Sequence, residues 1–180
     1  MFEKVESVKG FVNFKLSVSF LESLVNNALN KKNEFAKEDK KNEKILLEYV
    51  SANPTGPLHI GHARGAIAGD SLARVGKYLG FDITTEYYIN DAGAQMDLLG
   101  LSVSLAARDF IFKEDVVYPE TYYRGEYLID IANIVIEKFG KDIIYNESRF
   151  KEIAFFSKDL VMDIIIKDLK DLGITFDNFV

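Results

Sequence analysis

Apolar residues recur along this chain with two periods, and each period predicts a different kind of element. Residues 45–50 are almost all apolar, with Glu48 as the one charged position, which is typical of a strand buried in a parallel sheet. Apolar positions recur at helical steps over residues 60–79, which predicts an amphipathic helix that ends at Gly80. Residues 82–89 are rich in Ile, Thr and Tyr and predict a second strand. Strand, helix and strand in this order imply a right-handed parallel crossover.

The flanking residues extend this picture to an α/β fold class. Residues 12–18 alternate as in a half-buried strand, and residues 174–180 look like the beginning of a third strand of the sheet. Further helices are predicted at about 20–29, 98–105, 127–139 and 148–172. We therefore expect the first half of a parallel sheet, a helical insertion at about 106–172, and one compact body.

Two histidines stand at the predicted start of the first long helix, directly after the turn at residues 53–57. His59 and His62 are three positions apart, so they lie on one face beside unpaired N–H groups and the positive end of the helix dipole, where phosphate binds readily. Gly61 between them leaves room for a ligand to approach the backbone. Two alternatives stay open. The histidines could be surface or helix-capping residues, or a metal pair, which would need further ligands.

Polar residues stand where the two predicted strands end. Glu48 breaks a buried strand and should have a cationic partner, unless it is an exposed residue at a strand edge. Ligands of parallel sheets bind beyond the carboxyl ends of the strands, which is where Asn53 and residues 90–95 would fall. The alternative is that Asn90 or Asp91 only caps the following helix.

Composition and charge narrow the class of protein. The chain has 180 residues, 48% of them apolar and 28% charged, which is ordinary for a globular domain. It has no cysteine, which excludes disulfides and cysteine nucleophiles, and no signal peptide or apolar run of membrane-spanning length, so we expect a cytoplasmic protein with no membrane partner. The net charge of −6 argues against a broad, nonspecific grip on nucleic acid but leaves local contacts open.

Three collinear stretches resemble a known family. Residues 48–66, Glu-Tyr-Val-Ser-Ala-Asn-Pro-Thr-Gly-Pro-Leu-His-Ile-Gly-His-Ala-Arg-Gly-Ala, resemble the first signature of a class I aminoacyl-tRNA synthetase, and specifically of arginyl-tRNA synthetase. Residues 90–95, Asn-Asp-Ala-Gly-Ala-Gln, and residues 123–127, Tyr-Arg-Gly-Glu-Tyr, fit the same family. The resemblance implies a Rossmann-like sheet.

The same resemblance implies a domain plan. Residues 1–30 would be the remnant of an additional N-terminal domain, residues 31–44 a charged connector, and residues 45–180 a partial catalytic domain. The connector mixes lysines with acids, so it could contact the tRNA backbone, serve as a flexible linker, or simply be a solvated connection.

The activity that the resemblance implies is ATP-dependent attachment of arginine to its tRNA. His59 and His62 would stabilise the transition state at the α-phosphorus, and Mg²⁺ would accompany ATP. The implied ATP-binding residues are Thr55, His59, Gly61 and His62. The implied arginine-binding residues are Glu48, Ser51, Asn53, Asp91 and Gln95.

The chain departs from the family pattern in one respect. It contains no signature like Lys-Met-Ser-Lys-Ser, so we expect an N-terminal-side piece that needs the remainder of the enzyme and lacks full activity alone. The alternatives are a noncatalytic nucleotide- or tRNA-binding fragment, or a nucleotidylyltransferase, a superfamily that shares the His-x-Gly-His helix start. A cluster of tyrosines could stack on a tRNA end or be ordinary packing. These are Tyr118, Tyr122, Tyr123 and Tyr127.

Overall fold

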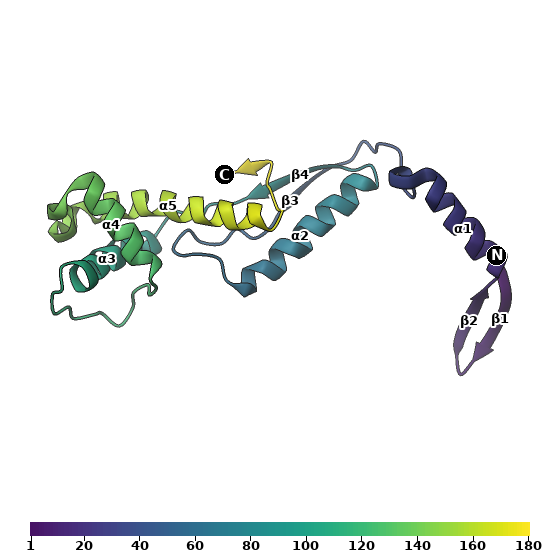
Figure 1. Ribbon diagram of the computed structural model, residues 1–180, viewed down its shortest axis with the longest axis horizontal. Coiled ribbons are helices and arrows are strands. Elements are labelled where there is room, and N and C mark those ends of the chain that lie inside the picture. Colours follow the sequence, from purple (N-terminus) through teal and green to yellow (C-terminus); the bar gives the residue numbers. More distant parts are fainter. The chain divides into compact units, whose positions relative to one another are not determined.

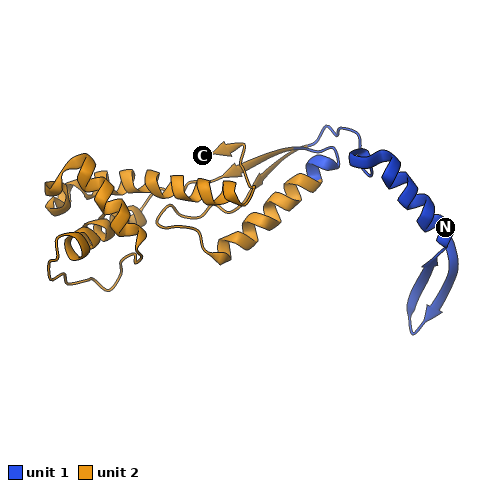
Figure 2. Cartoon of the chain, viewed as in Figure 1, with its two compact units in different colours: residues 1–43, 76–82 blue, residues 44–75, 83–180 orange.

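The computed structural model describes all 180 residues, from Met1 to Val180. It divides into two compact units, residues 1–43 with 76–82 and residues 44–75 with 83–180 (Figure 2). The expectation of one compact body is therefore wrong. The physical reason is that no side chain among residues 1–43 is buried, so this segment contributes nothing to a common core.

The smaller unit begins with a β-hairpin and a helix. Strands β1 (Phe2–Val8) and β2 (Phe11–Leu16) pair antiparallel, and the two turn residues both have positive φ, as the tight hairpin turns require. Every residue of β2 is exposed, so the predicted half-buried strand is wrong. No third element covers either face of this hairpin. Helix α1 (Val18–Lys31) follows, capped by Ser17, whose Oγ accepts a hydrogen bond from the Phe20 amide at 3.3 Å.

The charged connector is anchored within the same unit. After a 3₁₀ turn (Lys32–Glu34), the hydroxyl of Tyr78 bonds to the carbonyl oxygen of Phe35. The amide of Lys41 donates to the Gly80 carbonyl at 2.7 Å, and the Lys41 ammonium lies 4.3 Å from the centre of the Phe81 ring. These contacts hold the connector at several points, unlike a freely flexible linker.

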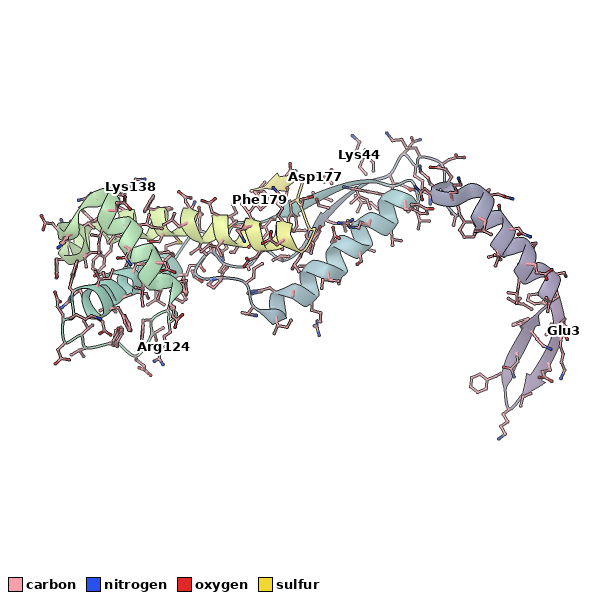
Figure 3. The ribbon with its side chains drawn as sticks, viewed as in Figure 1. Glu3, Lys44, Arg124, Lys138, Asp177 and Phe179 are labelled. Atoms are coloured by element: carbon pink, nitrogen blue, oxygen red, sulfur yellow. The ribbon has the colours of Figure 1, made fainter.

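The larger unit contains a three-stranded sheet in the order β3-β4-β5 (Figure 1). The strands are β3 (Lys44–Glu48), β4 (Asp82–Tyr87) and β5 (Asn178–Phe179), and β5 pairs parallel with β4, as predicted for the third strand. Asp177, which lies just before β5 (Figure 3), accepts hydrogen bonds at Oδ2 from the amide and the hydroxyl of Thr85, at 2.8 and 3.0 Å. The prediction of a buried first strand is wrong, because β3 is an outer strand of this sheet and none of its residues is buried.

Helix α2 (Ile60–Tyr78) joins β3 to β4 and packs through its small residues. Its buried residues are Ala66 and Ala73, and a Cβ added at Gly69 would lie 2.3 Å from the ring of Tyr49. The larger apolar residues used to predict the inward face are exposed instead. They are Ile60, Ile67, Leu72 and Val75. Close packing thus follows the alanine and glycine positions, because only they let the helix backbone approach its neighbours.

Three helices form the main hydrophobic core. They are α3 (Ala94–Ala106), which continues into a π-helical turn (Ala107–Ile111), α4 (Tyr127–Phe139) and α5 (Phe150–Asp171). Two 3₁₀ turns (Lys141–Tyr145 and Glu147–Arg149) connect α4 to α5. The core residues include Leu99, Val103, Ile131, Val135, Ile153, Val161 and Ile165.

The helical body formed by these three helices begins at Ala94, because α3 shares its core with α4 and α5. Gly140 and Gly173, with φ of 82° and 76°, stand just beyond α4 and α5, where the helices predicted at about 127–139 and 148–172 end. None of the helices combines the length and the apolar content that crossing a membrane requires.

Candidate active site

The segment between β3 and the turn at residues 53–57 has an unusual backbone. Val50 and Ser51 have positive φ, 67° and 39°, a conformation that costs about 1–3 kcal/mol per residue and is concentrated at functional sites. Ser51 compensates through its side chain, since its Oγ donates to Glu48 Oε1 at 2.6 Å and accepts from the Tyr88 amide at 3.1 Å. The ends of β3 and β4 are joined in this way. Glu48 itself is exposed on the outer strand β3, which agrees with the alternative of an exposed residue at a strand edge.

Two further bonds place the turn at the carboxyl end of the sheet. The hydroxyl of Tyr87 donates to the Ala52 carbonyl at 2.8 Å, and Asn90 Nδ2 donates to Asn53 Oδ1 at 3.2 Å. Burial raises the pKa of Tyr87 to about 12, so this hydroxyl remains a donor at every physiological pH. The turn is therefore fastened to the end of β4, the position where parallel sheets bind ligands.

The helical body holds the same turn from another side. The hydroxyl of Tyr127, at the start of α4, donates to the Thr55 carbonyl at 2.7 Å. Burial raises the pKa of Tyr127 to about 12. A Cβ added at Gly56 would lie 3.1 Å from the Tyr127 oxygen, so glycine permits this close approach. The start of α4 is thereby connected directly to the turn.

The two histidines lie stacked at the start of α2, with ring centres 3.8 Å apart. His59 Nδ1 accepts from the Gly61 amide at 3.1 Å, and His62 Nδ1 accepts from the His59 amide at 3.3 Å. Burial, and secondarily the neighbouring His59, lower the pKa of His62. A neutral ring that accepts at Nδ1 carries its proton on Nε2. The capping interpretation therefore applies to Nδ1, while each Nε2–H remains available as a donor.

Gly61 serves these rings in a way that the sequence did not indicate. A Cβ at this position would lie 2.9 Å from Cε1 of His59. The missing side chain makes room for the His59 imidazole, in addition to any room that it leaves for a ligand.

The turn and the helix start border a cavity of about 660 Å³. The lining residues are Asn53, Thr55, Gly56, Pro57, His59 and His62, together with residues 123–127. The structure thus brings together four predicted site residues and leaves Gly61, Glu48 and Ser51 outside the lining. Glu48 and Ser51 lie just before the turn, bonded to each other.

Asp91 and Gln95 also lie outside this lining. Gln95 Nε2 donates to the carbonyl oxygens of Asn90 and Ala92, at 2.6 and 3.0 Å, and Asp91 Oδ2 lies 3.5 Å from Lys158 Nζ. The cap of α3 is Gly93, with no side-chain cap bond, so the alternative in which Asn90 or Asp91 caps this helix is wrong. Gln95 thus bonds to the loop after β4, and Asp91 connects this loop to Lys158 on α5.

Residues 123–127 are the part of the cavity that local patterns did not identify. They stand about seventy positions after the turn, and the only signal for them in the sequence was the resemblance of Tyr-Arg-Gly-Glu-Tyr to a family motif. The structure contains no group of three or more His, Asp or Glu side chains positioned to hold a metal ion.

Comparisons with known proteins agree with this geometry. Residues 24–179 match the family described as tRNA synthetases class I (R), catalytic domain. The chain is 76% identical over 180 residues to an arginine–tRNA ligase of Aliarcobacter butzleri and 59% identical over 180 residues to that of Sulfurimonas denitrificans. Each match covers 100% of this chain but only 34% of the relative, so the chain spans about a third of the relatives' length.

Solved structures give the same result. A Campylobacter jejuni crystal structure assigned as an arginyl tRNA synthetase is 50% identical, with a TM-score of 0.81 over 92% of this chain and 36% of that one. The Thermus thermophilus arginyl-tRNA synthetase, 22% identical with a TM-score of 0.56 over 99% of this chain and 29% of that one, shows the fold alone.

Fold and site together define an α/β protein with a Rossmann-like parallel sheet, as predicted. More particularly, the chain belongs to the class I tRNA synthetase family for arginine, within its catalytic domain.

Proposed function

We propose that this chain is part of an arginine–tRNA ligase. In the first step a carboxylate oxygen of arginine attacks the α-phosphorus of ATP, and pyrophosphate leaves, which gives arginyl-adenylate. In the second step a hydroxyl of the terminal tRNA ribose attacks the arginyl carbonyl carbon, and AMP leaves. No protein nucleophile takes part, so the protein acts by positioning the substrates and by stabilising charge on phosphate.

The observation that carries this proposal is the arrangement of the two histidines. Backbone amides occupy both Nδ1 atoms, so the Nε2–H groups of His59 and His62 are the free donors at the helix start, beside a cavity large enough for part of a nucleotide. They would donate to phosphate oxygens as charge develops there. Thr55 borders the same cavity, and Gly61 completes the helix start.

Arginine would bind beside this nucleotide, at the carboxyl ends of β3 and β4. Asn53 lines the cavity, and the exposed Glu48 carboxylate, oriented by Ser51, suits an ammonium or guanidinium group. Asp91 and Gln95 follow β4 and would act at the margin of this site. Mg²⁺ would be held mainly by the ATP phosphates and would neutralise part of their charge.

Isothermal titration with Mg²⁺ and ATP tests the role of the histidines. We expect binding by the unchanged chain and loss of binding in a His59→Ala, His62→Ala double variant whose circular dichroism shows that it is folded. Lys151→Ala is the matched control, because this exposed lysine on α5 lies outside the cavity. Equal ATP binding by the double variant and the unchanged chain would refute the role assigned to the histidines.

A single-turnover charging assay with added tRNA and labelled arginine tests the activity of the chain itself. We expect no arginyl-tRNA, because the second nucleotide-binding signature implied by the family is absent from this sequence. Formation of arginyl-tRNA by the chain alone would contradict this expectation. The proposal includes action in the cytoplasm, where tRNA is charged for translation.

A further inference from the structure

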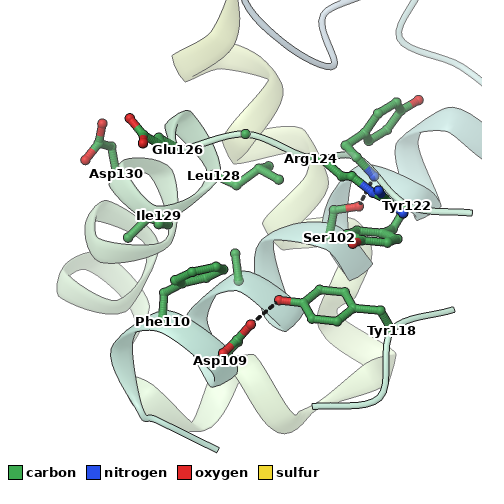
Figure 4. Close-up of a pocket in the computed structure, with 13 residues that line it drawn as sticks. Ser102, Asp109, Phe110, Tyr118, Tyr122, Arg124, Glu126, Leu128, Ile129 and Asp130 are labelled. Carbon is green, nitrogen blue, oxygen red and sulfur yellow. Dashed lines mark hydrogen bonds between the residues drawn. The ribbon is translucent and has the colours of Figure 1, made fainter. Parts of the chain in front are cut away.

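Several polar side chains that line the cavity of about 800 Å³ between α3 and α4 contact one another (Figure 4). Tyr118 donates a hydrogen bond to Asp109 at 2.5 Å, and the guanidinium carbon of Arg124 lies 4.6 Å from the centre of the Tyr122 ring. These phenol and guanidinium groups therefore already have partners within the chain. The outer side of α2 differs, because its apolar and charged side chains face solvent.

Helix α2 is apolar on two sides. It packs inward through Ala66 and Ala73, yet Ile60 is 89% exposed and Ile67 is 56% exposed. These two isoleucines are seven residues apart, so they lie two turns from each other on one side of the helix, and Val75, 55% exposed, continues that side. A helix that is apolar on its open side as well as on its packed side is typical of a helix that is covered on both.

A groove of about 390 Å³ lies between this side of α2 and the end of α5. Three residues of α2 and three at the end of α5 form most of its lining, namely Ile60, Ala63, Ala66, Asp168, Leu169 and Leu172. Leu172 is 55% exposed at the rim. The small alanine side chains leave space between the larger residues, so aliphatic side chains of another surface can enter the groove.

The same surface carries one cation and one anion that have no partner. Arg64 lies one turn after Ile60 and is exposed, and its guanidinium group makes no hydrogen bond or ion pair. Asp168 is half-buried, and its carboxylate makes no hydrogen bond or ion pair, since the adjacent Lys167 is paired with Asp171 at 2.9 Å. Opposite charges on one surface are self-complementary, because a twofold axis places the cation of each copy opposite the anion of the other.

We propose that two copies of this chain associate through this surface, the α2 outer face. It consists of Ile60, Arg64, Ile67, Val75, Asp168 and Leu172. The isoleucines of each copy enter the groove of the other, and each Arg64 pairs with Asp168 of the other copy. The four apolar side chains expose roughly 400 Å², and with the polar rim this approaches the ~600–800 Å² per partner of a small specific interface, so we expect a micromolar dissociation constant. His59 borders the groove as well as the cavity at the turn, so the second copy would lie next to the proposed phosphate site.

Sedimentation velocity of the whole chain, from about 1 to 200 μM, measures this association. We expect the mass to rise from that of one chain to that of two and no further, since a twofold contact closes on itself. Ile67→Glu should weaken the pair at least about tenfold. Val117→Glu is the matched control, because Val117 is 91% exposed and lies outside the groove, and it should leave the dissociation constant unchanged.

A charge exchange tests the predicted pairing of Arg64 with Asp168. Arg64→Asp and Asp168→Arg should each weaken association by about tenfold, because each variant places like charges opposite each other twice. The double variant restores opposite charges across the axis and should return to within about threefold of the unchanged chain. A single-chain mass at every concentration would overturn the proposal and leave the α2 outer face to another part of a longer ligase. Association that persists in Ile67→Glu, or a double variant no tighter than the single ones, would overturn it as well, since the contact would then lie elsewhere, as on the exposed hairpin.

Discussion

The hydrogen bond from Tyr127 to the Thr55 carbonyl connects the helical body directly to the turn at residues 53–57, and deleting one oxygen atom removes it. Tyr127→Phe keeps the ring and deletes the hydroxyl that donates at 2.7 Å. The ring is half-buried against Gly56, so it should keep its position in the variant. The change therefore isolates the hydrogen bond from the packing around it.

The size of the effect follows from the kind of bond. A neutral hydrogen bond between an uncharged donor and acceptor contributes about 1 kcal/mol to the free energy of unfolding, and the loss rises toward about 2 kcal/mol if water does not reach the orphaned carbonyl. If the bond also keeps Thr55 and the histidines in their binding arrangement, ATP affinity should fall by up to about fivefold, the equivalent of about 1 kcal/mol.

Urea unfolding measures the first quantity and calorimetric titration with Mg²⁺ and ATP the second. Tyr118→Phe is the matched control, because this hydroxyl also has a pKa raised to about 12 and donates one hydrogen bond, to Asp109, away from the histidine cavity. Both variants should lose stability, and only Tyr127→Phe should lose ATP affinity. Equal loss of affinity in both variants, or none in Tyr127→Phe despite its lower stability, would refute the positioning role.

Two further predictions concern α2. Gly69→Ala should lower the free energy of unfolding by about 1–3 kcal/mol, since the new Cβ would lie 2.3 Å from the Tyr49 ring, whereas Gly65→Ala, with no atom within 4 Å, should raise it by about 0.5–1 kcal/mol. Urea unfolding measures both free energies, and a stabilised Gly69→Ala variant would contradict the close packing of α2 against Tyr49. The lowered pKa of His62 means that the unfolded chain binds more protons than the folded one below about pH 6.5, so stability from this group should be complete above that pH and fall as the pH drops through the folded-state pKa. His62→Asn should flatten this part of the stability curve, and an unchanged slope between pH 7 and 5 would show that His62 does not cause it.

Much of the local structure could be read from the amino-acid order. The turn at residues 53–57, the helix start at Ile60 and the ends of α4 and α5 near residues 139 and 172 were all predicted, because turn chemistry and helix termination depend on residues close in the chain. The placement of the histidines beside the helix start followed from the same local rules. So did the third strand, although its pairing involves only two residues.

The arrangement of these elements depended on contacts between distant residues. Apolar periodicity marked Ile67 and Leu72 as inward, yet α2 packs through Ala66, Ala73 and Gly69, since periodicity records polarity and not how closely two backbones can approach. Likewise the outer position of β3 depends on strand order, which no local pattern contains.

The site shows the same division. Local sequence patterns supplied the histidines, and the family resemblance supplied Thr55. The hydrogen bond between Tyr127 and Thr55, 72 residues apart, exists only because the helical body folds back onto the turn. The sequence therefore identified the chemical groups of the site. The tertiary fold decided which of them share a cavity, because the packing of the whole unit sets the distances between remote segments.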